Sequence, residues 1–191
     1  MKLIDRFLPS YDFREMHSIS MRCSRREALD AIEDLSLSEL PRSAAALIWI
    51  RGIPERLAGK PAPPLDPTEP IIRQVTASGF LVSDEGKDSE LAAGLVGQYW
   101  KSRGGSSLVR SGEDFVAFER LDHTMVAANF VVADDPAHAS VKVTTETRVY
   151  TPGIAARRKF ALYWLFARPA SSFIKRAALR ALKRRAEGER S

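Results

Sequence analysis

The side chains that could take part in chemistry are few and scattered along the chain. The three histidines, His17, His123 and His138, are far apart, and the single cysteine, Cys23, has no partner motif. A metal site needs clustered ligands, so we predict no metal and no cofactor. The sequence also lacks a glycine-rich phosphate loop, a G-x-G-x-x-G fingerprint and a G-x-S-x-G nucleophile elbow. It therefore carries no recognisable catalytic motif.

Two residues are weak candidates for acid–base catalysis. Burial would raise the pKa of Glu119, because desolvation disfavours a carboxylate, and would suit this residue to proton transfer. The simpler interpretation of Glu119 is an exposed side chain at the end of a hairpin. His17 lies at the start of an apolar strand face, where it would contact a ligand or sit at the rim of the core.

The first element that would position such residues is a strand near the N-terminus. Residues 1–14 read as an irregular lead-in that packs apolar side chains on the body. From Glu15 to Cys23 the side chains then alternate, which is the period of a half-buried strand. His17, Ile19, Met21 and Cys23 share one face of it.

Helices are predicted next. Ser24 and Glu27 have capping-box spacing, and an apolar stripe at helical spacing follows as far as Leu35. Further helices are expected over residues 38–51 and 68–77, on either side of a proline-rich connection at 58–67.

The middle of the chain reads as strands joined by short turns. The predicted strands cover residues 80–84, 89–100, 115–120, 125–133 and 140–150, with a possible short one at 108–110. Strands that are segregated from helices in this way predict an α+β fold with an antiparallel sheet.

The last two predicted strands allow a prediction of which side chains face inward. If Val132 lies opposite Val141, cross-strand partners share a mostly apolar face, which should be the inner one. The further pairs are Phe130 with Val143, Ala128 with Thr145, and Val126 with Thr147. Phe115, Ala117 and Glu119 would join this inner face from the preceding strand. Asn129, Lys142, Thr144, Glu146 and Arg148 would then fall on the outer face. There Glu146 and Arg148 would form a polar ladder whose members each contribute little to stability.

The C-terminal segment, residues 154–187, is predicted to be one long amphipathic helix with a bend. A straight helix of this length would run about 51 Å, longer than a sheet of this size is wide, and Pro169 should kink it. Four aromatic side chains lie before Pro169 and should pack on the sheet. The half after it could extend past the sheet. Residues 154–191 hold 11 Lys/Arg against 2 Asp/Glu, although the whole chain carries only +5.

Length and composition are those of one soluble domain. The 191 residues are 45% hydrophobic and 28% charged. A single cysteine excludes an intramolecular disulfide and fits a reducing, cytoplasmic location. We expect neither a signal peptide nor a membrane span, because no apolar run has the length that either needs.

Three stretches carry a resemblance to a known superfamily. They are YDFREMHSISMRCSRREALDAI (11–32), FVAFERLDHTMVAANFVVA (115–133) and VTTETRVYTPGIAARRKFALYW (143–164). Together with the order of elements they resemble bacterial members, of unassigned function, of the helix-grip or SRPBCC superfamily. That superfamily includes START lipid-binding domains, polyketide cyclases and birch-pollen-allergen-like proteins. The resemblance implies a curved antiparallel sheet of six to seven strands around the C-terminal helix, with a deep apolar cavity between them.

The expected function follows from that cavity. We expect a single domain (residues 1–191) that binds or carries a hydrophobic small molecule or lipid. The cavity would be lined by Ile19, Met21, Leu95, Tyr99, Ala128, Phe130, Thr145, Thr147, Tyr163 and Trp164. Many of these would equally serve as plain core residues.

Two alternatives stay open. One is an enzyme of the cyclase, dehydratase or hydrolase kind, for which a buried ionisable group would be the discriminating feature. The other is an interaction module that uses the basic helix. An anionic membrane surface suits a basic amphipathic helix better than nucleic acid does, since no recognition motif or stacking aromatic accompanies the basic half. The contacting residues would be Lys175, Arg176, Arg180, Lys183 and Arg184.

Overall fold

The computed structural model describes residues 2–51, 66–76, 79–84, 89–101, 109–136 and 139–188. Within them the chain forms one antiparallel sheet of five strands in the order β1-β5-β4-β3-β2. The strands are β1 (Phe13–Met21), β2 (Phe80–Asp84), β3 (Ser89–Gly97), β4 (Thr124–Asp135) and β5 (Ser140–Tyr150). The prediction of an α+β fold with an antiparallel sheet is confirmed.

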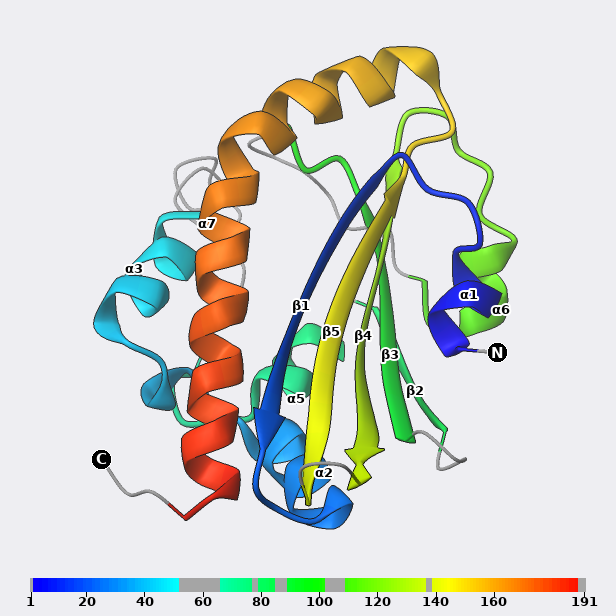
Figure 1. Cartoon of the computed structure of the whole chain (residues 1–191). Coiled ribbons are helices and arrows are strands. Elements are labelled where there is room, and N and C mark those ends of the chain that lie inside the picture. The colour runs from blue at the N-terminus through cyan, green and yellow to red at the C-terminus, as the bar shows by residue number, and fades with distance from the viewer. Residues whose placement is uncertain are drawn as a thin grey trace.

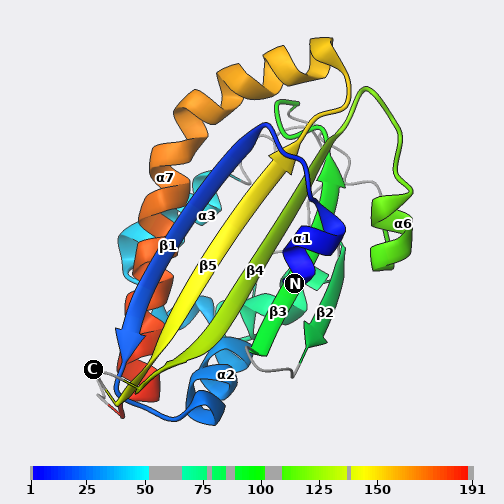
Figure 2. The same ribbon diagram turned by 45° about the vertical axis from the view of Figure 1, so that its right-hand side comes forward.

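Helices cover both faces of this sheet (Figure 1). The short helices α1 (Leu3–Phe7) and α6 (Gly112–Val116) lie on one face. On the other face lie α2 (Arg25–Asp34), the 3-10 turn η1 (Leu37–Glu39), α3 (Arg42–Arg51), α5 (Ile71–Thr76) and α7 (Ile154–Ala186). The rotated view shows the strands running side by side between these two layers (Figure 2). We call the face toward α7 the inner face and the face toward α1 the outer face.

The start of α2 follows from its sequence. The Ser24 hydroxyl accepts a hydrogen bond from the backbone N–H of Glu27, and the Glu27 carboxylate accepts one from the N–H of Ser24. This capping box satisfies backbone donors that would otherwise have no partner at a helix N-terminus. The predicted capping box is therefore confirmed.

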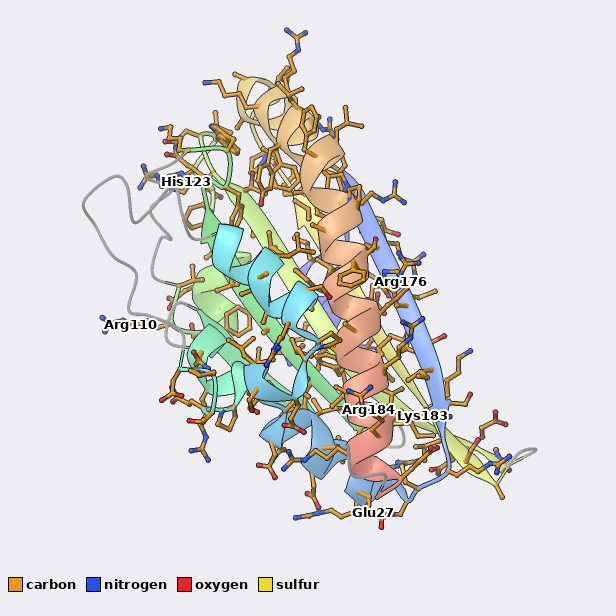
Figure 3. The ribbon with its side chains drawn as sticks, turned by 90° about the vertical axis from the view of Figure 1, so that its left-hand side faces the viewer. Glu27, Arg110, His123, Arg176, Lys183 and Arg184 are labelled. Atoms are coloured by element: carbon orange, nitrogen blue, oxygen red, sulfur yellow. The ribbon has the colours of Figure 1, made fainter. Side chains whose placement is uncertain are left out.

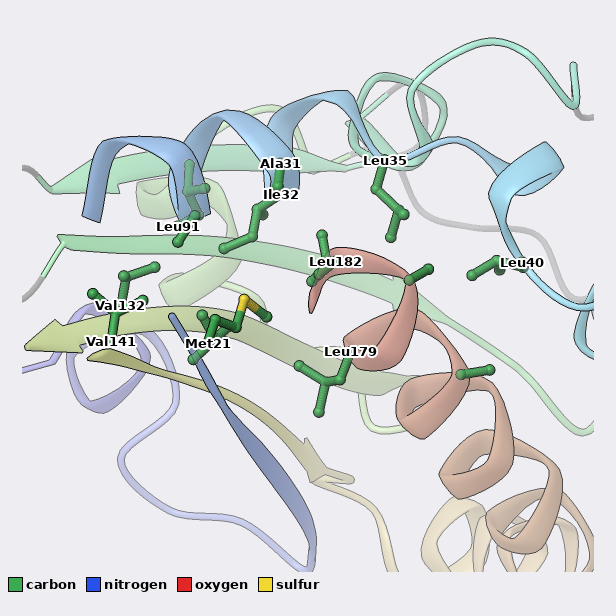
Figure 4. Packing of buried hydrophobic residues seen from close by; sticks show 14 of the residues in the cluster. Met21, Ala31, Ile32, Leu35, Leu40, Leu91, Val132, Val141, Leu179 and Leu182 are labelled. Carbon is green, nitrogen blue, oxygen red and sulfur yellow. The ribbon is translucent and has the colours of Figure 1, made fainter. Parts of the chain in front are cut away.

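The main core lies where α2 and the second half of α7 meet the inner face (Figure 4). Met21 and Val143 reach it from the sheet, Ile32 from α2, and Leu179 and Leu182 from α7. Burial of such side chains stabilises a fold by about 1.5–3 kcal/mol each. The expectation that the half of α7 after Pro169 could extend past the sheet is wrong, because its apolar stripe is part of this core.

The helix α7 runs unbroken for 33 residues with Pro169 inside it. Its first part crosses over one end of the sheet, and it then bends to run beside β1 (Figure 1). Proline has no N–H to donate and its ring clashes with the preceding turn, so we attribute the bend to Pro169. The predicted kink is therefore present as a bend within one helix.

Four local predictions are wrong. Residues 1–14, expected to be an irregular lead-in, hold α1 and the start of β1. The strand expected over residues 115–120 is replaced by α6, and Phe115 packs on the outer face, where it contacts Phe80. Ser111 caps α6 by accepting from the N–H of Asp114, a signal that the apolar alternation concealed. The helix expected over 38–51 is divided at Leu40 and Pro41. Val109 and Arg110, predicted as part of a short strand, carry no strand.

The β4–β5 pairing is displaced by two residues from the predicted register. Val132 lies opposite Val143, Phe130 opposite Thr145 and Ala128 opposite Thr147. Side chains alternate with a period of two, so a shift of two keeps every residue on its predicted face. The inner-face residues of β4 and β5 were therefore predicted correctly but with the wrong partners, whereas Phe115, also predicted to face inward, packs on the outer face.

Candidate functional site

Rows of cross-strand neighbours cross the inner face from β3 through β4 and β5 to β1. Three of them are Leu95–Val126–Val149–Phe13, Ala93–Ala128–Thr147–Glu15 and Leu91–Phe130–Thr145–His17. The β3 and β4 ends of the rows are apolar, and two of their residues are alanines. The β1 end carries a carboxylate and an imidazole, with two threonines next to them on β5. The face is thus apolar on one side and polar on the other.

Glu15 is the centre of the polar side. Its carboxylate accepts hydrogen bonds from Ser171 Oγ (3.0 Å) and Lys175 Nζ (2.7 Å), and also from the Ser172 hydroxyl. His17 Nε2 lies 2.9 Å from the same carboxylate. The Glu15 side chain is only 3% exposed. The cluster fixes α7 to β1 directly after the proline that bends the helix.

These contacts decide the charge of Glu15. Burial alone would raise its pKa, but hydrogen bonds from Lys175, Ser172 and His17 outweigh that effect and lower the pKa to about 2. A general base works best with a pKa near the working pH. Glu15 is therefore negatively charged at neutral pH and orients its neighbours, and its pKa is too low for it to act as the general base.

Sequence reasoning missed Glu15 as a site residue. The signal was present, since the alternation that puts His17 and Ile19 on the inner face also puts Glu15 there. What the sequence lacked was the partner, because Ser171 and Lys175 lie more than 150 residues away in the chain.

Aromatic side chains close the end of the inner face where α7 crosses it. The Phe160 ring stacks on Trp164 with centroids 5.8 Å apart, and it contacts Tyr163, Phe13 and Tyr99 at 5.3–6.4 Å. Phe160 itself is buried, whereas Tyr163 and Trp164 are half-buried. The prediction that the aromatics of this half of the helix pack on the sheet is confirmed for Phe160 and Trp164, which both contact Phe13 of β1. Tyr163 contacts Phe160 of the same helix, and Phe166 is exposed.

The predicted cavity-lining residues all lie on this inner side, but they belong to different environments. Met21 is fully buried in the main core, and Thr145 and Thr147 are buried in the rows beside the Glu15 cluster. The half-buried members are Ile19, Leu95, Tyr99, Ala128, Phe130, Tyr163 and Trp164.

The two weak catalytic candidates have different surroundings. Glu119 is exposed and lies in the irregular stretch after α6, away from the rows. His17 is half-buried on the inner face beside Glu15. Of the other histidines, His123 contacts Asp122 (2.8 Å), and His138 is outside the described residues. The described part of the chain holds no group of three potential metal ligands.

The outer face carries a second buried polar network. The sequence had predicted only a polar ladder there, with little contribution to stability. Arg148 donates to Glu146 (2.8 Å), to Asp5 of α1 (2.7 Å) and to the carbonyl of Leu8. Arg14 also donates to Glu146 (2.7 Å), so burial would raise the pKa of Glu146 but the two guanidinium groups hold it below its usual value. The prediction is wrong because it had no means to place α1 over these residues.

The same network extends to β3. Asn129 donates to Glu90 and accepts from the backbone N–H of Glu146, and Glu90 accepts from the N–H groups of Leu3 and Ile4 at the start of α1. Each of these contacts joins α1 to the sheet or one strand to its neighbour. We assign this network to fixing α1 on the sheet.

The basic residues after Pro169 mostly bind their own chain (Figure 3). The contacts are Lys175 to Glu15, Arg176 to the Ser172 carbonyl, Lys183 to the Ser20 carbonyl, Arg184 to the Glu39 carbonyl, and Arg185 to Glu39 and Asp34. A pocket of about 210 Å³ lies between the second half of α7 and Pro41, the residue directly before α3. It is lined by Pro41, Phe173, Arg176, Ala177, Arg180 and Arg184.

Comparison with known proteins finds no matching family model, no similar curated protein and no similar solved structure. No described helix is both long enough and apolar enough to cross a membrane.

Proposed function

We propose that this protein is a helix-grip protein that binds a hydrophobic small molecule or lipid between the inner face of the sheet and α7. The observation that carries this proposal is the division of the inner-face rows into an apolar and a polar side. A ligand with an apolar body and one polar group matches that division. The body would lie on Ala93, Ala128 and Phe130, and the polar group would face Thr147 and His17.

Two features of the apolar side support a binding role over a filled core. Ala93 and Ala128 are direct cross-strand partners, so the centre of this face has little side-chain volume. Together with their apolar neighbours Leu95, Val126 and Phe130 they are only half-buried. Interiors of proteins are normally close-packed, so apolar side chains that keep partial exposure on an inner face are typical of a ligand surface.

The order of elements supports the helix-grip assignment. A first strand is followed by helices, then by the antiparallel meander β2 to β5, and finally by the long helix that lies across the inner face. This is the order on which the resemblance to the SRPBCC superfamily rests. The described residues account for five strands of the six to seven that the superfamily implies.

Native mass spectrometry of the protein purified from its own host tests the proposal. We expect a bound small molecule or lipid that is released on denaturation. A fluorescent fatty acid, cis-parinaric acid, gives a second measurement, and Ala128→Trp should weaken its binding by filling the inner face. Ala133→Trp is the matched control, since Ala133 lies on the same strand but on the outer face.

Two outcomes would refute the binding proposal. One is repeated absence of any co-purified molecule together with no binding of the fatty acid. The other is equal binding by the Ala128→Trp and Ala133→Trp variants, provided that circular dichroism shows both to be folded.

A second candidate function is supported by the pairing of His17 with Glu15. An imidazole held by a charged carboxylate and facing two buried hydroxyls is an arrangement that suits general acid–base catalysis. An enzyme of the cyclase, dehydratase or hydrolase kind would then act on the same ligand. Host metabolite extract incubated with wild-type protein should contain a new product, which His17→Gln should fail to form while still binding cis-parinaric acid.

A further inference from the structure

The outward face of the first half of α7 is apolar and uncovered. Leu162, Leu165 and Phe166 are 64%, 68% and 74% exposed. At 3.6 residues per turn, these three residues and three further apolar residues lie within about a third of the helix circumference. We call this set of six the outer stripe, where 'outer' means the side of α7 that faces away from the sheet. Its members are Ile154, Leu162, Leu165, Phe166, Pro169 and Phe173. The helix is thus apolar on two sides, with Phe160 packed inward and the outer stripe facing away from the sheet.

Basic side chains accompany the outer stripe without any acidic residue on the helix. No Asp or Glu occurs between residues 154 and 186. Arg158, Lys159 and Arg168 are exposed, and no carboxylate in the described part of the chain forms an ion pair with them. Arg157 differs, because it pairs with Asp12.

The stripe ends at a pocket that is itself basic. Phe173 is the last residue of the stripe and also lines the pocket of about 210 Å³. The guanidinium-bearing residues there are Arg176, Arg180 and Arg184, and none of the described residues that line it is acidic. Arginine forms bidentate hydrogen bonds with phosphate, so this pocket is suited to a phosphate group.

We propose that the outer stripe docks this protein on an anionic membrane surface. The stripe enters the boundary between head groups and acyl chains, and the arginine pocket receives the phosphate of a neighbouring lipid. Helices with one apolar face and flanking Lys/Arg lie in this interfacial plane, and each basic residue near an anionic surface strengthens the binding. The proposal does not depend on a ligand between the sheet and α7, since every residue it uses points away from that face.

The charge pattern favours a membrane over a second copy of the chain. In a two-fold symmetric dimer the same surface patch meets itself, so Arg158, Lys159 and Arg168 would face the same cations of the other copy. Like charges placed opposite each other across an interface disfavour association. An anionic lipid surface turns the same cations into an attraction.

Co-sedimentation with vesicles tests the proposal. The full chain should bind vesicles of phosphatidylcholine and phosphatidylglycerol in equal parts, and should bind pure phosphatidylcholine far more weakly. Leu165→Ser with Phe166→Ser should lower the affinity by at least about tenfold, because two large apolar groups lose their burial. The matched control is Met16→Ser with Val116→Ser, which removes two exposed apolar residues elsewhere and should leave binding unchanged.

A second pair of variants tests the role of charge. Arg176→Gln with Arg180→Gln should lower the affinity for the anionic vesicles by about tenfold or more, with a smaller loss as salt rises from about 0.1 to about 1 M. Arg26→Gln with Arg185→Gln removes the same charge from residues that pair with carboxylates of their own chain, and should change binding less than twofold.

An insertion measurement separates docking from simple electrostatic adsorption. The Phe166→Trp variant should show a blue shift and quenching by brominated acyl chains, which a residue outside the bilayer would not show. The proposal is overturned if wild-type protein does not bind the anionic vesicles, or if Leu165→Ser with Phe166→Ser binds as well as the Met16/Val116 control. A dimer in analytical ultracentrifugation that this stripe variant dissociates, without vesicle binding, would overturn it in favour of a second copy.

Discussion

The two halves of α7 are both made mainly of apolar and basic residues, but their surroundings differ. After Pro169, Ala177, Leu179, Ala181 and Leu182 are buried in the main core, and the basic side chains between them mostly reach polar groups of the same chain. Before Pro169, only Ala156 and Phe160 are buried. The leucines and a phenylalanine of that half are exposed, next to Arg158, Lys159 and Arg168, which pair with no carboxylate of the described residues.

This difference changes the contact surface that charge alone predicts. The half after Pro169 carries most of the positive charge and was therefore the predicted contact surface. Its cations are largely committed to groups such as Glu15, Glu39 and the Ser20 carbonyl. A side chain that is already paired with a carboxylate must exchange that partner to bind another, so Lys175 and Arg185 are poor candidates for a contact surface. The better candidates are Arg158, Lys159 and Arg168, which pair with no described carboxylate, together with the pocket arginines Arg176 and Arg180.

The largest expected difference in the free energy of unfolding is between alanine substitutions at two leucines of the same helix. Leu182→Ala should lower the free energy of unfolding by about 3 kcal/mol, because Leu182 is fully buried and leaves a cavity. Leu162→Ala should change it by less than about 0.5 kcal/mol, because Leu162 is largely exposed. Urea denaturation of both variants checks this, and equal losses would mean that the two halves of α7 do not differ in burial.

The contact that fixes the second half to β1 should have the next largest effect. Glu15→Gln should cost about 2 kcal/mol at neutral pH, because Lys175 and two serines lose a charged acceptor. The folded pKa of about 2 lies below the ordinary value of 4.5, so this stabilisation is present above pH 4.5 and is lost as the pH falls toward 2.

The measurement is urea denaturation of both proteins at a series of pH values. The free energy of unfolding of the wild-type protein should fall to that of Glu15→Gln between about pH 4.5 and pH 2. A constant difference across that range would contradict the assigned pKa. Glu33→Gln on α2 is a control, since Glu33 is exposed and lies outside the Glu15 cluster.

The smallest expected difference in the free energy of unfolding is between glutamine substitutions at two exposed arginines. Arg185→Gln should lower the free energy of unfolding by about 0.5 kcal/mol, because Arg185 pairs with Glu39 and Asp34 at the surface. Arg168→Gln, before the bend, should leave it unchanged. Thermal melts in low and high salt check this, since only the Arg185 difference should shrink in high salt.

Much of the local structure could be predicted from the sequence. Alternation identified β1, β2, β3, β4 and β5, the Ser24–Glu27 spacing identified the start of α2, and Pro169 identified the bend in α7. The β4–β5 faces were correct even with a register shifted by two, since period-two alternation determines the face and the loop determines the partner. The candidate site was predicted in part, through His17, Thr145 and Thr147.

The errors share one physical cause. Residues 115–120 alternate like a strand, yet they form α6 and coil, because the Phe115 side chain finds its burial next to Phe80 and Gly94 on the outer face. Glu146 and Arg148 alternate outward like solvated residues, yet α1 covers them. In each case the outcome depended on an element far away in the sequence.

The sequence by itself determined the fold class, the faces of the strands, the bend in α7 and the concentration of positive charge in that helix. Hydrophobic periodicity, capping and proline geometry are local properties that a short window carries. Only the tertiary structure decided which charges are paired and which apolar side chains stay exposed. Glu15 obtains its low pKa from residues 171–175, and Phe166 remains exposed because the helix turns its other side to the sheet. Burial and charge pairing depend on neighbours in space, and those are set by packing of the whole chain.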